Sequence, residues 1–350
     1  MGKFKKMAKN LEKEMYFNPR FLLPYGRNFN FVNAVRSVGK TYSPVLFFIN
    51  EYMEKEVESV LLCRTKKDKE KGKYLERAVS KVMAEQFKGL DYKVNSDELL
   101  IQGKTALRCI ALSEAINIKK NGYPLVKYLY LDEYAIEENA VQRYVTGWDE
   151  PDLLLSIYHT IDREEDRVIF FGMANNISAY NPYHLHKAFN IPYTDKGNIF
   201  MSDNVLFLHY QRSDQLTEKT EKCKFLNMIK GTDYGNFASE GEYIYDNNEL
   251  IYNYPLKYCT YFLTLKYNGK VYGIWNYNIL KWTYYVTESI NPTFKDKVAV
   301  TMNDINTEFR YMNRTDFSTQ ILKQAVRSGN LHFQNQKLKK LFTEIIPYFL

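Results

Sequence analysis

The chain has 350 residues, of which 45% are apolar, and a formal net charge of +7. It is too long for one ordinary hydrophobic core, so two domains are expected. No apolar run approaches the ~18 residues of a membrane span and the lysine-rich start lacks a signal-peptide core, which argues against a membrane or secreted protein. The four cysteines and five histidines show no zinc spacing, so neither a metal cluster nor a disulfide framework is expected. The positive charge permits a polyanionic partner without requiring one.

The first informative stretch follows a basic lead-in. Phe29 and Phe31 alternate with other residues as in a strand, and a loop of small residues then ends in Gly39-Lys40-Thr41. An amphipathic run predicts a helix with Pro44 in its first turn, where a missing N–H costs little. Strand, loop, Gly-Lys-Thr and helix together are typical of a phosphate-binding P-loop. The tripeptide alone is weak evidence, because an ordinary turn with an exposed lysine would look the same.

The P-loop prediction gives its residues chemical roles. Backbone N–H groups and the helix N-terminus cradle a triphosphate, Lys40 neutralises the outer phosphates and Thr41 binds Mg²⁺. Ala34 stands where glycine is usual, and alanine would be strained there if the position needs a positive φ. The predicted nucleotide-binding residues are Ala34, Arg36, Ser37, Val38, Gly39, Lys40, Thr41 and Tyr42.

Strands and helices alternate after the P-loop. Residues 57–63 read as a strand, residues 64–73 as a basic loop and residues 75–87 as a helix with one apolar stripe. Two apolar runs on either side of Gly103-Lys104 predict a hairpin. This alternation is typical of an α/β domain.

A second motif follows at the end of the next strand. Residues 125–131 are mostly apolar and lead into Asp132 and Glu133, as in a Walker B motif. Asp132 would hold Mg²⁺ through water, and Glu133 would orient or deprotonate the attacking water. The gap of roughly ninety residues after the P-loop leaves room for an extra strand, as in ATPases with a catalytic glutamate.

Two further segments fit an ATPase. The strand 167–173 leads to Asn175, whose amide could sense the γ-phosphate and hold the water, although a turn asparagine is the simpler interpretation. Before it, a helix from about residue 149 ends in the charged loop Asp162–Arg167, which could present an arginine to a neighbouring subunit.

Several segments together resemble the genome-packaging ATPase of φ29-type tailed phages. They are Phe31–Tyr42, Leu131–Tyr134, Asn181–Tyr183 and Gly231–Gly235. The resemblance runs from Tyr16 to about Phe333. It implies a ring of identical subunits, expected to be a pentamer, that docks on the portal of an empty capsid and uses ATP and Mg²⁺ to drive double-stranded DNA inside. Whether a packaging RNA bridges ring and portal stays open, and the expected location is the host cell cytoplasm, transiently at the portal vertex.

The resemblance also implies roles for single residues. Lys40, Thr41, Asp132 and Glu133 fall on the nucleotide and catalytic positions of that family. Arg36 matches the family's P-loop arginine, and Arg163 matches its arginine finger. Lys119 matches a lysine that acts across the subunit interface, and Lys66 matches a basic residue after the second strand.

The C-terminal part of the chain differs in composition from the part before it. Residues 211–224 are polar and indicate a domain boundary. Three β-rich runs, at 258–267, 270–277 and 281–287, predict a meander with Asn268-Gly269 in its first turn. Two helices, from about 315 to 327 and from about 334 to 346, are predicted after it.

Strands followed by helices resemble the RNase H-like nuclease domain of packaging motors. Such nucleases hold paired metals with an aspartate in the middle of the first strand, but Tyr258–Leu265 contains no acidic residue. A nuclease-inactive, DNA-binding domain is therefore expected. Lys337, Lys339 and Lys340 are candidate phosphate contacts, with solvated helix lysines as the alternative.

The expected fold is thus an α/β P-loop NTPase of the additional-strand catalytic-glutamate type with a largely parallel sheet, followed by a smaller α+β RNase H-like domain. The expected boundaries are 1–212 for the ATPase domain, 213–240 for a linker region and 241–350 for the C-terminal domain. Two alternatives remain. One is another ring-forming DNA translocase or helicase, and the other is a non-catalytic nucleotide-gated assembly protein, against which Glu133 and Arg163 argue.

Overall fold

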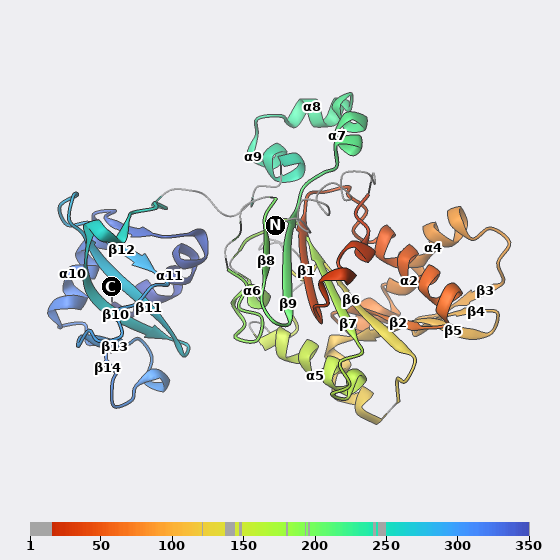
Figure 1. Ribbon diagram of the computed structural model, residues 1–350, viewed down its shortest axis with the longest axis horizontal. Coiled ribbons are helices and arrows are strands. Elements are labelled where there is room, and N and C mark those ends of the chain that lie inside the picture. Colours follow the sequence, from red (N-terminus) through yellow and green to blue (C-terminus); the bar gives the residue numbers. More distant parts are fainter. Residues whose placement is uncertain are drawn as a thin grey trace. The chain divides into compact units, whose positions relative to one another are not determined.

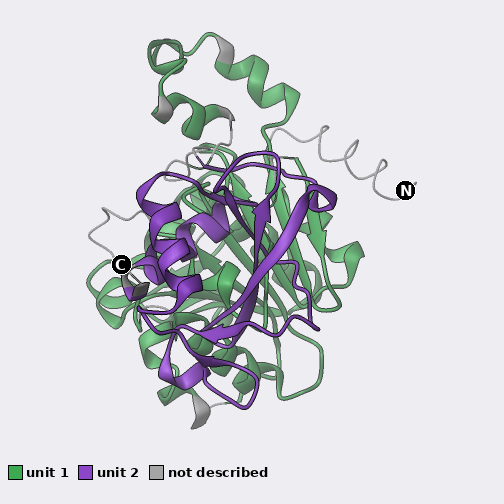
Figure 2. Cartoon of the chain, turned by 90° about the vertical axis from the view of Figure 1, so that its left-hand side faces the viewer, with its two compact units in different colours: residues 1–245 green, residues 246–350 purple. Residues whose placement is uncertain are grey.

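The computed structural model describes residues 16–120, 122–136, 144–146, 149–179, 181–192, 194, 197–240, 243 and 250–349. The chain divides into two compact units, residues 1–245 and 246–350 (Figure 2), each with its own sheet. The segment 213–240, expected as a linker region, lies within the first unit. Within the described ranges, no helix is long and apolar enough to cross a membrane.

The first unit is built on a nine-stranded sheet in the order β3-β4-β5-β2-β6-β7-β1-β9-β8 (Figure 1). Its strands are β1 (Phe29–Ala34), β2 (Glu58–Cys63), β3 (Tyr92–Val94), β4 (Glu98–Ile101), β5 (Lys104–Ala111), β6 (Val126–Asp132), β7 (Ile169–Ala174), β8 (Ile199–Met201) and β9 (Val205–Tyr210). The strands from β5 to β9 in this order run parallel, and antiparallel partners flank them at both edges. Because β7 lies between β1 and β6, an extra strand separates the two motif strands, and the predicted largely parallel α/β fold is confirmed.

Helices cover both faces of this sheet. They are α2 (Tyr42–Lys55), α3 (Lys66–Glu70), α4 (Tyr74–Gln86), α5 (Glu150–Asp162) and α6 (Pro182–Leu185). In β6, Tyr130 packs with the apolar residues of α2 and α4, whereas Leu131 packs with those of α5 on the other face. Every residue of β1, β2 and β9 is buried, as expected for parallel strands covered on both sides.

The parallel central strands end at one edge of the sheet. The P-loop follows β1, Asp132 is the last residue of β6, and Asn175 comes directly after β7. We call this set of strand ends the Walker edge. In open α/β sheets, ligands bind beyond the carboxyl ends of the strands, so the Walker edge is where a site is expected.

Short helices follow β9 and still belong to the first unit. They are α7 (Asp214–Glu221), α8 (Lys224–Ile229), α9 (Asp233–Gly235) and one helical turn at Asn236–Glu240 (Figure 1). Gly231 has a φ of +78°, and a Cβ on Gly235 would lie 2.1 Å from the carbonyl oxygen of Ile229. Both glycines of the Gly-Thr-Asp-Tyr-Gly segment are therefore required by the local backbone. Phe237, just beyond them, is buried against the first unit's core.

The second unit has a six-stranded sheet in the order β14-β13-β10-β11-β12-β15. Its elements are β10 (Cys259–Tyr267), β11 (Lys270–Tyr277), β12 (Tyr284–Thr287), β13 (Lys297–Ala299), β14 (Arg310–Tyr311), α10 (Phe317–Arg327), β15 (Leu331–Phe333) and α11 (Gln336–Phe349). The antiparallel meander β10-β11-β12 and both helices are as predicted. Asn268 and Gly269 both adopt positive φ in the first turn, as an Asn-Gly hairpin requires. Asp304 fixes this turn by accepting hydrogen bonds from the N–H groups of Asn268 and Gly269 at 2.8 and 2.7 Å.

Candidate active site

The P-loop connects β1 to α2 at the Walker edge. Ala34 is the last residue of β1 and has no positive φ, so alanine causes no backbone strain there. The left-handed positions are instead Ser37, with a φ of +68°, and Gly39, with a φ of +84°. A Cβ on Gly39 would lie 2.7 Å from Ser43 Oγ and 3.2 Å from Tyr16 Cβ, so glycine is required for space as well.

Lys40 is held against its own loop. Its ammonium donates to the carbonyl oxygens of Val35 at 2.7 Å and Ala34 at 3.4 Å. Burial lowers the pKa of Lys40 to about 8, and the nearby charges of Asp132 and Arg36 act in opposite directions on it. Burial makes the charged form of Lys40 unfavourable, and a bound anion would stabilise that charged form. A lysine that binds phosphate needs this property.

Two contacts join the P-loop to the end of β6. The Thr41 hydroxyl donates to Asp132 Oδ2, and the Tyr130 hydroxyl donates to the carbonyl oxygen of Lys40 at 2.7 Å. Burial raises the pKa of Asp132, an effect opposed by the Thr41 hydrogen bond and the charge of Lys40. The two motifs that the sequence predicts at separate places therefore meet at one point of the Walker edge.

The next residue, Glu133, is exposed and begins a turn. Its N–H donates to Asp132 Oδ1 at 3.0 Å, and its φ is +53°. The left-handed region costs a non-glycine residue roughly 1–2 kcal/mol. Such a conformation persists where surrounding contacts fix it.

Buried polar contacts hold the neighbouring residues. The Tyr134 hydroxyl donates to the side-chain oxygen of Asn33 in β1 and contacts His184 Nε2 at 2.9 Å. Asn175 directly follows β7, whose last residue, Ala174, is paired with Asn33 of β1. The side-chain oxygen of Asn175 is buried and has no hydrogen-bond partner among the residues that the structure describes. A buried amide oxygen without a partner, directly after the strand beside β1, supports Asn175 as a candidate sensor, and this role stays a prediction.

Arg36 points to a different part of the first unit. Its guanidinium lies 5.5 Å from the ring centre of Phe237 and 5.9 Å from that of Tyr234. Arg212 donates to the carbonyl oxygens of Arg36 at 3.4 Å and Ala238 at 3.1 Å. The Gly-Thr-Asp-Tyr-Gly segment thus packs on the P-loop. Sequence reasoning missed this contact and the role of Arg212, because nothing local in the sequence connects residues so far apart.

The remaining predicted site residues lie elsewhere. Arg163 is exposed and follows α5, which is about 20 Å long at 1.5 Å per residue. Arg167, near it, donates to the carbonyl oxygen of Val126 at the start of β6. Arg163 therefore lies near the amino ends of β6 and β7, opposite the Walker edge. Lys119 lies in a short helical turn, Asn117–Lys120, and its side chain is outside the described part of the structure.

The predicted DNA contacts lie on α11 of the second unit. Lys337 is 5% exposed, and its ammonium pairs with Glu288 at 3.4 Å. Lys339 and Lys340 are half-buried. This burial removes the basis for Lys337 as a phosphate contact, whereas Lys339 and Lys340 stay predictions.

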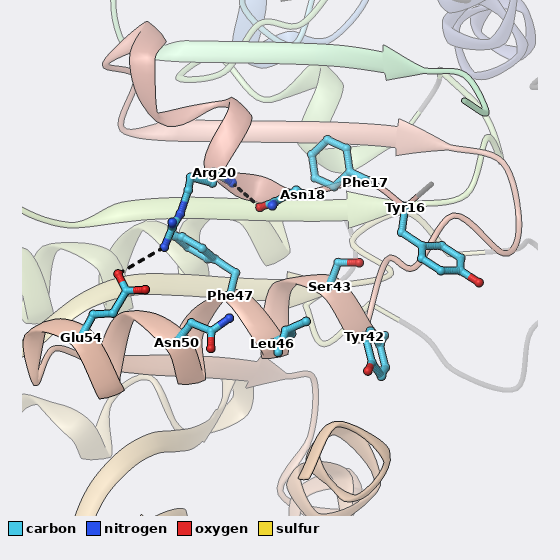
Figure 3. A pocket seen from close by; sticks show the side chains of 10 residues that line it. All are labelled: Tyr16, Phe17, Asn18, Arg20, Tyr42, Ser43, Leu46, Phe47, Asn50 and Glu54. Carbon is cyan, nitrogen blue, oxygen red and sulfur yellow. Dashed lines mark hydrogen bonds and ion pairs between the residues drawn. The ribbon is translucent and has the colours of Figure 1, made fainter. Parts of the chain in front are cut away.

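A cavity of about 380 Å³ lies beside the P-loop, between the segment Tyr16–Arg20 and one side of α2 (Figure 3). Tyr16, Tyr42 and Ser43 line the end that adjoins Gly39. The ion pair of Arg20 and Glu54, at 3.6 Å, lies at the other end. The remaining lining residues are Phe17, Asn18, Leu46, Phe47 and Asn50.

The donor set at the Walker edge suits a hard cation. The Thr41 hydroxyl and the Asp132 carboxylate are in direct contact, and Mg²⁺ prefers one or two such oxygens completed by phosphate oxygens and water. The described residues contain no group of three or more histidine, cysteine, aspartate or glutamate side chains that could hold a metal. A cation here would therefore depend on a bound phosphate for its remaining ligands.

Known proteins share this architecture. A model of the podovirus DNA encapsidation protein (Gp16) family matches residues 11–348. The chain belongs to this family. The DNA packaging proteins of Bacillus phages PZA and phi29 are each 26% identical to this chain over 337 residues, covering 96% of this chain and 98% of the relative. The structure of the bacteriophage phi29 genome packaging motor assembly shares the fold, with a TM-score of 0.72, 24% identity and coverage of 96% of this chain and 100% of that chain.

The family and the site geometry agree. The chain is a member of the DNA encapsidation family, with a larger unit that carries the P-loop and Walker B motifs, followed along the chain by a smaller sheet unit. The predicted resemblance to φ29-type packaging proteins is confirmed.

Proposed function

We propose that this protein forms a homo-oligomeric ring, expected to be a pentamer, on the portal of an empty capsid. There, ATP bound at the Walker edge is hydrolysed to drive double-stranded DNA into the capsid. The relatives carry the name DNA packaging protein, and a similar chain belongs to a packaging motor assembly. The ring, the portal vertex, the host cytoplasm as the location and any packaging RNA are parts of this proposal.

One observation carries the catalytic part. The Thr41–Asp132 and Tyr130–Lys40 hydrogen bonds bring P-loop and Walker B residues together at the carboxyl ends of β1 and β6, two parallel strands with β7 between them. In the proposed cycle, Lys40 neutralises the outer phosphates and Glu133 orients the attacking water or takes its proton. Asn175 would hold that water from the third strand end.

Thr41 and Asp132 would hold Mg²⁺ together with the phosphates. When bound, this cation supplies charge neutralisation for the leaving phosphates. The chain's own residues supply the rest, because Lys40 and the loop N–H groups bind the nucleotide and orient it.

The nucleoside half of ATP would occupy the cavity in Figure 3. Its volume of about 380 Å³ suits a base. Tyr16 and Tyr42 supply aromatic surface, and Asn18 and Asn50 supply hydrogen-bonding groups. Ser43, which lines the cavity in the first turn of α2, lies beside Gly39, and the phosphates would extend from there along the P-loop.

Arg163 would act on the nucleotide of a neighbouring subunit. It is exposed at the edge of the sheet opposite its own Walker edge, which favours action in trans over action in cis. Lys119 is proposed for the same interface from the family resemblance alone.

The second unit would bind DNA without cutting it. The first strand of its meander, β10, has no acidic residue to hold a metal. A translocating motor must tolerate every sequence, so its contacts should go mainly to phosphates. We propose the functional division 1–212, 213–240 and 241–350, with the middle segment as the connection between nucleotide and DNA functions.

The experiment compares two variants on assembled procapsids with DNA. Glu133→Gln should keep ATP binding and lose hydrolysis by roughly 10²–10⁴-fold, because it removes only the general base. Lys40→Ala should weaken ATP binding itself, because it removes the main cation facing the outer phosphates. Turnover by Glu133→Gln near that of the unchanged protein would contradict the catalytic role, and DNA entry without ATP consumption would contradict the motor.

A further inference from the structure

A fully buried ion pair lies directly behind the catalytic turn. Arg64 is 2% exposed and Glu150 is 0% exposed, and Arg64 Nε lies 3.2 Å from Glu150 Oε1. Buried charges are costly, so a buried pair that is merely structural could be replaced by apolar residues. The other hydrogen bonds of Arg64 indicate a role in fixing the turn at Glu133.

Arg64 is brought to the Walker edge by strand register. It follows the last residue of β2, and Leu62 of β2 is paired with Leu131 of β6. Two residues further on, Arg64 lies level with Glu133. Arg64 Nη2 donates to the carbonyl oxygen of Glu133 at 2.8 Å and to that of Tyr134 at 3.0 Å.

These two hydrogen bonds fix the turn that carries the catalytic carboxylate. Glu133 has a φ of +53°, a conformation that L-residues leave unless their surroundings hold it. Arg64 binds the carbonyl of Glu133 and the one after it, so the turn cannot relax by rotating these peptides without breaking a charge-assisted hydrogen bond.

Glu150 in turn fixes Arg64. It accepts hydrogen bonds from the Tyr183 hydroxyl at 2.8 Å and from the Val145 N–H at 2.7 Å. The Tyr144 ring lies 5.4 Å from the Arg64 guanidinium carbon. The carboxylate thus accepts a hydrogen bond on each oxygen, and it forms the buried ion pair with Arg64 as well.

We propose that Arg64 is a positioning residue for ATP hydrolysis, which holds Glu133 in its working conformation and is itself oriented by Glu150. The proposal rests on the proposed catalytic role of Glu133. Glu150 is the first residue of α5, and Arg163 follows the last residue of this helix. If α5 moved at a subunit interface, the Glu150–Arg64 ion pair would therefore transmit the movement to the turn at Glu133.

The test replaces both buried charges at once, so that neither is left unpaired. The double variant Arg64→Met with Glu150→Leu is assembled on procapsids with DNA. ATP affinity is measured by titration with ATP, and kcat is normalised to the folded fraction. The expected result is a melting temperature and ATP affinity close to those of the unchanged protein, with kcat lower by tenfold or more.

Tyr183→Phe is the matched control: it removes a hydrogen bond to Glu150 but leaves Arg64 in place, and its kcat should stay within twofold.

A merely structural pair gives a different pattern. The proposal is overturned if the double variant folds and keeps the kcat of the unchanged protein. If this variant does not fold, Arg64→Lys decides. Its ammonium keeps the buried charge beside Glu150 but lacks the planar fork that reaches the turn as well, so a severalfold loss of kcat at unchanged ATP affinity is expected, and an unchanged kcat overturns the proposal. Glu133→Gln is measured in parallel. If it stays active, the catalytic role of Glu133 fails; if it is inactive while the Arg64 variants are fully active, only the positioning role fails.

Discussion

The Walker edge of the first unit and the surface of the second unit use charged side chains in different ways. At the Walker edge, Lys40, Thr41 and Asp132 are each held by hydrogen bonds that involve buried strands. In the second unit, the lysines predicted to contact DNA lie along α11, and Lys337 forms an ion pair with Glu288. Chemistry on a phosphate depends on geometry within fractions of an ångström, whereas sequence-independent DNA binding needs only charge at the surface.

This comparison implies that single substitutions at the proposed ATP-binding and catalytic positions have large effects, whereas single substitutions on the second unit have small ones. The predictions below test it in that order.

The largest effect is expected at Arg163. A trans-acting arginine stabilises charge that develops on the γ-phosphate, which is typically worth roughly 10³–10⁵ in rate. Arg163→Ala should nearly abolish ring ATPase activity and leave ATP affinity almost intact. Mixing it with Glu133→Gln before assembly should restore measurable hydrolysis, because some interfaces then pair an intact Glu133 with an intact Arg163. Mixed rings that stay as inactive as either parent would place Arg163 in its own subunit's chemistry or outside the reaction.

An intermediate effect, on stability, is expected at Lys40. Its pKa is lowered to about 8 by burial, below the ordinary value of about 10.4 in an unfolded chain. Between these values the unfolded chain binds more protons, so this group's contribution to stability rises with pH and its full cost is present below about pH 8. Lys40→Met should therefore melt a few degrees higher than the unchanged nucleotide-free protein at pH 7, and this advantage should shrink toward pH 10.

The control for Lys40 is Lys88→Met, at an exposed lysine. Melting curves of both variants at several pH values provide the measurement. A Lys40→Met protein that is no more stable than Lys88→Met at pH 7 would show that the P-loop does not destabilise its lysine.

The smallest effect is expected on the second unit. Each lysine that contacts a phosphate contributes about 0.9 to the slope of log affinity against log salt. Lys339→Gln and Lys340→Gln should each lower this slope by about that amount in the full chain, and Lys337→Gln should leave it unchanged. A loss of slope in Lys337→Gln alone would reverse the assignment. DNA cleavage by the full chain in Mn²⁺, abolished by changing an acidic residue of the second unit, would contradict the absence of nuclease activity.

The sequence alone determined the elements and motifs of this protein. Gly39-Lys40-Thr41, the acidic end of β6 and the Asn268-Gly269 hairpin depend on periodicity and turn chemistry within a few residues, and each lies where the sequence predicts it. The fold class follows from the same local signals together with the family resemblance.

Only the tertiary structure decided which distant residues meet. It inserts β7 between β1 and β6, packs Phe237 on Arg36 and buries Lys337. It also joins Arg64 to Glu150 behind the turn at Glu133. Strand order, burial and ion pairing depend on partners tens of residues away in the sequence. A local pattern of apolar and polar residues therefore cannot predict them. For this reason, the sequence identifies Glu133 as the candidate catalytic carboxylate but not Arg64, which we propose to position it.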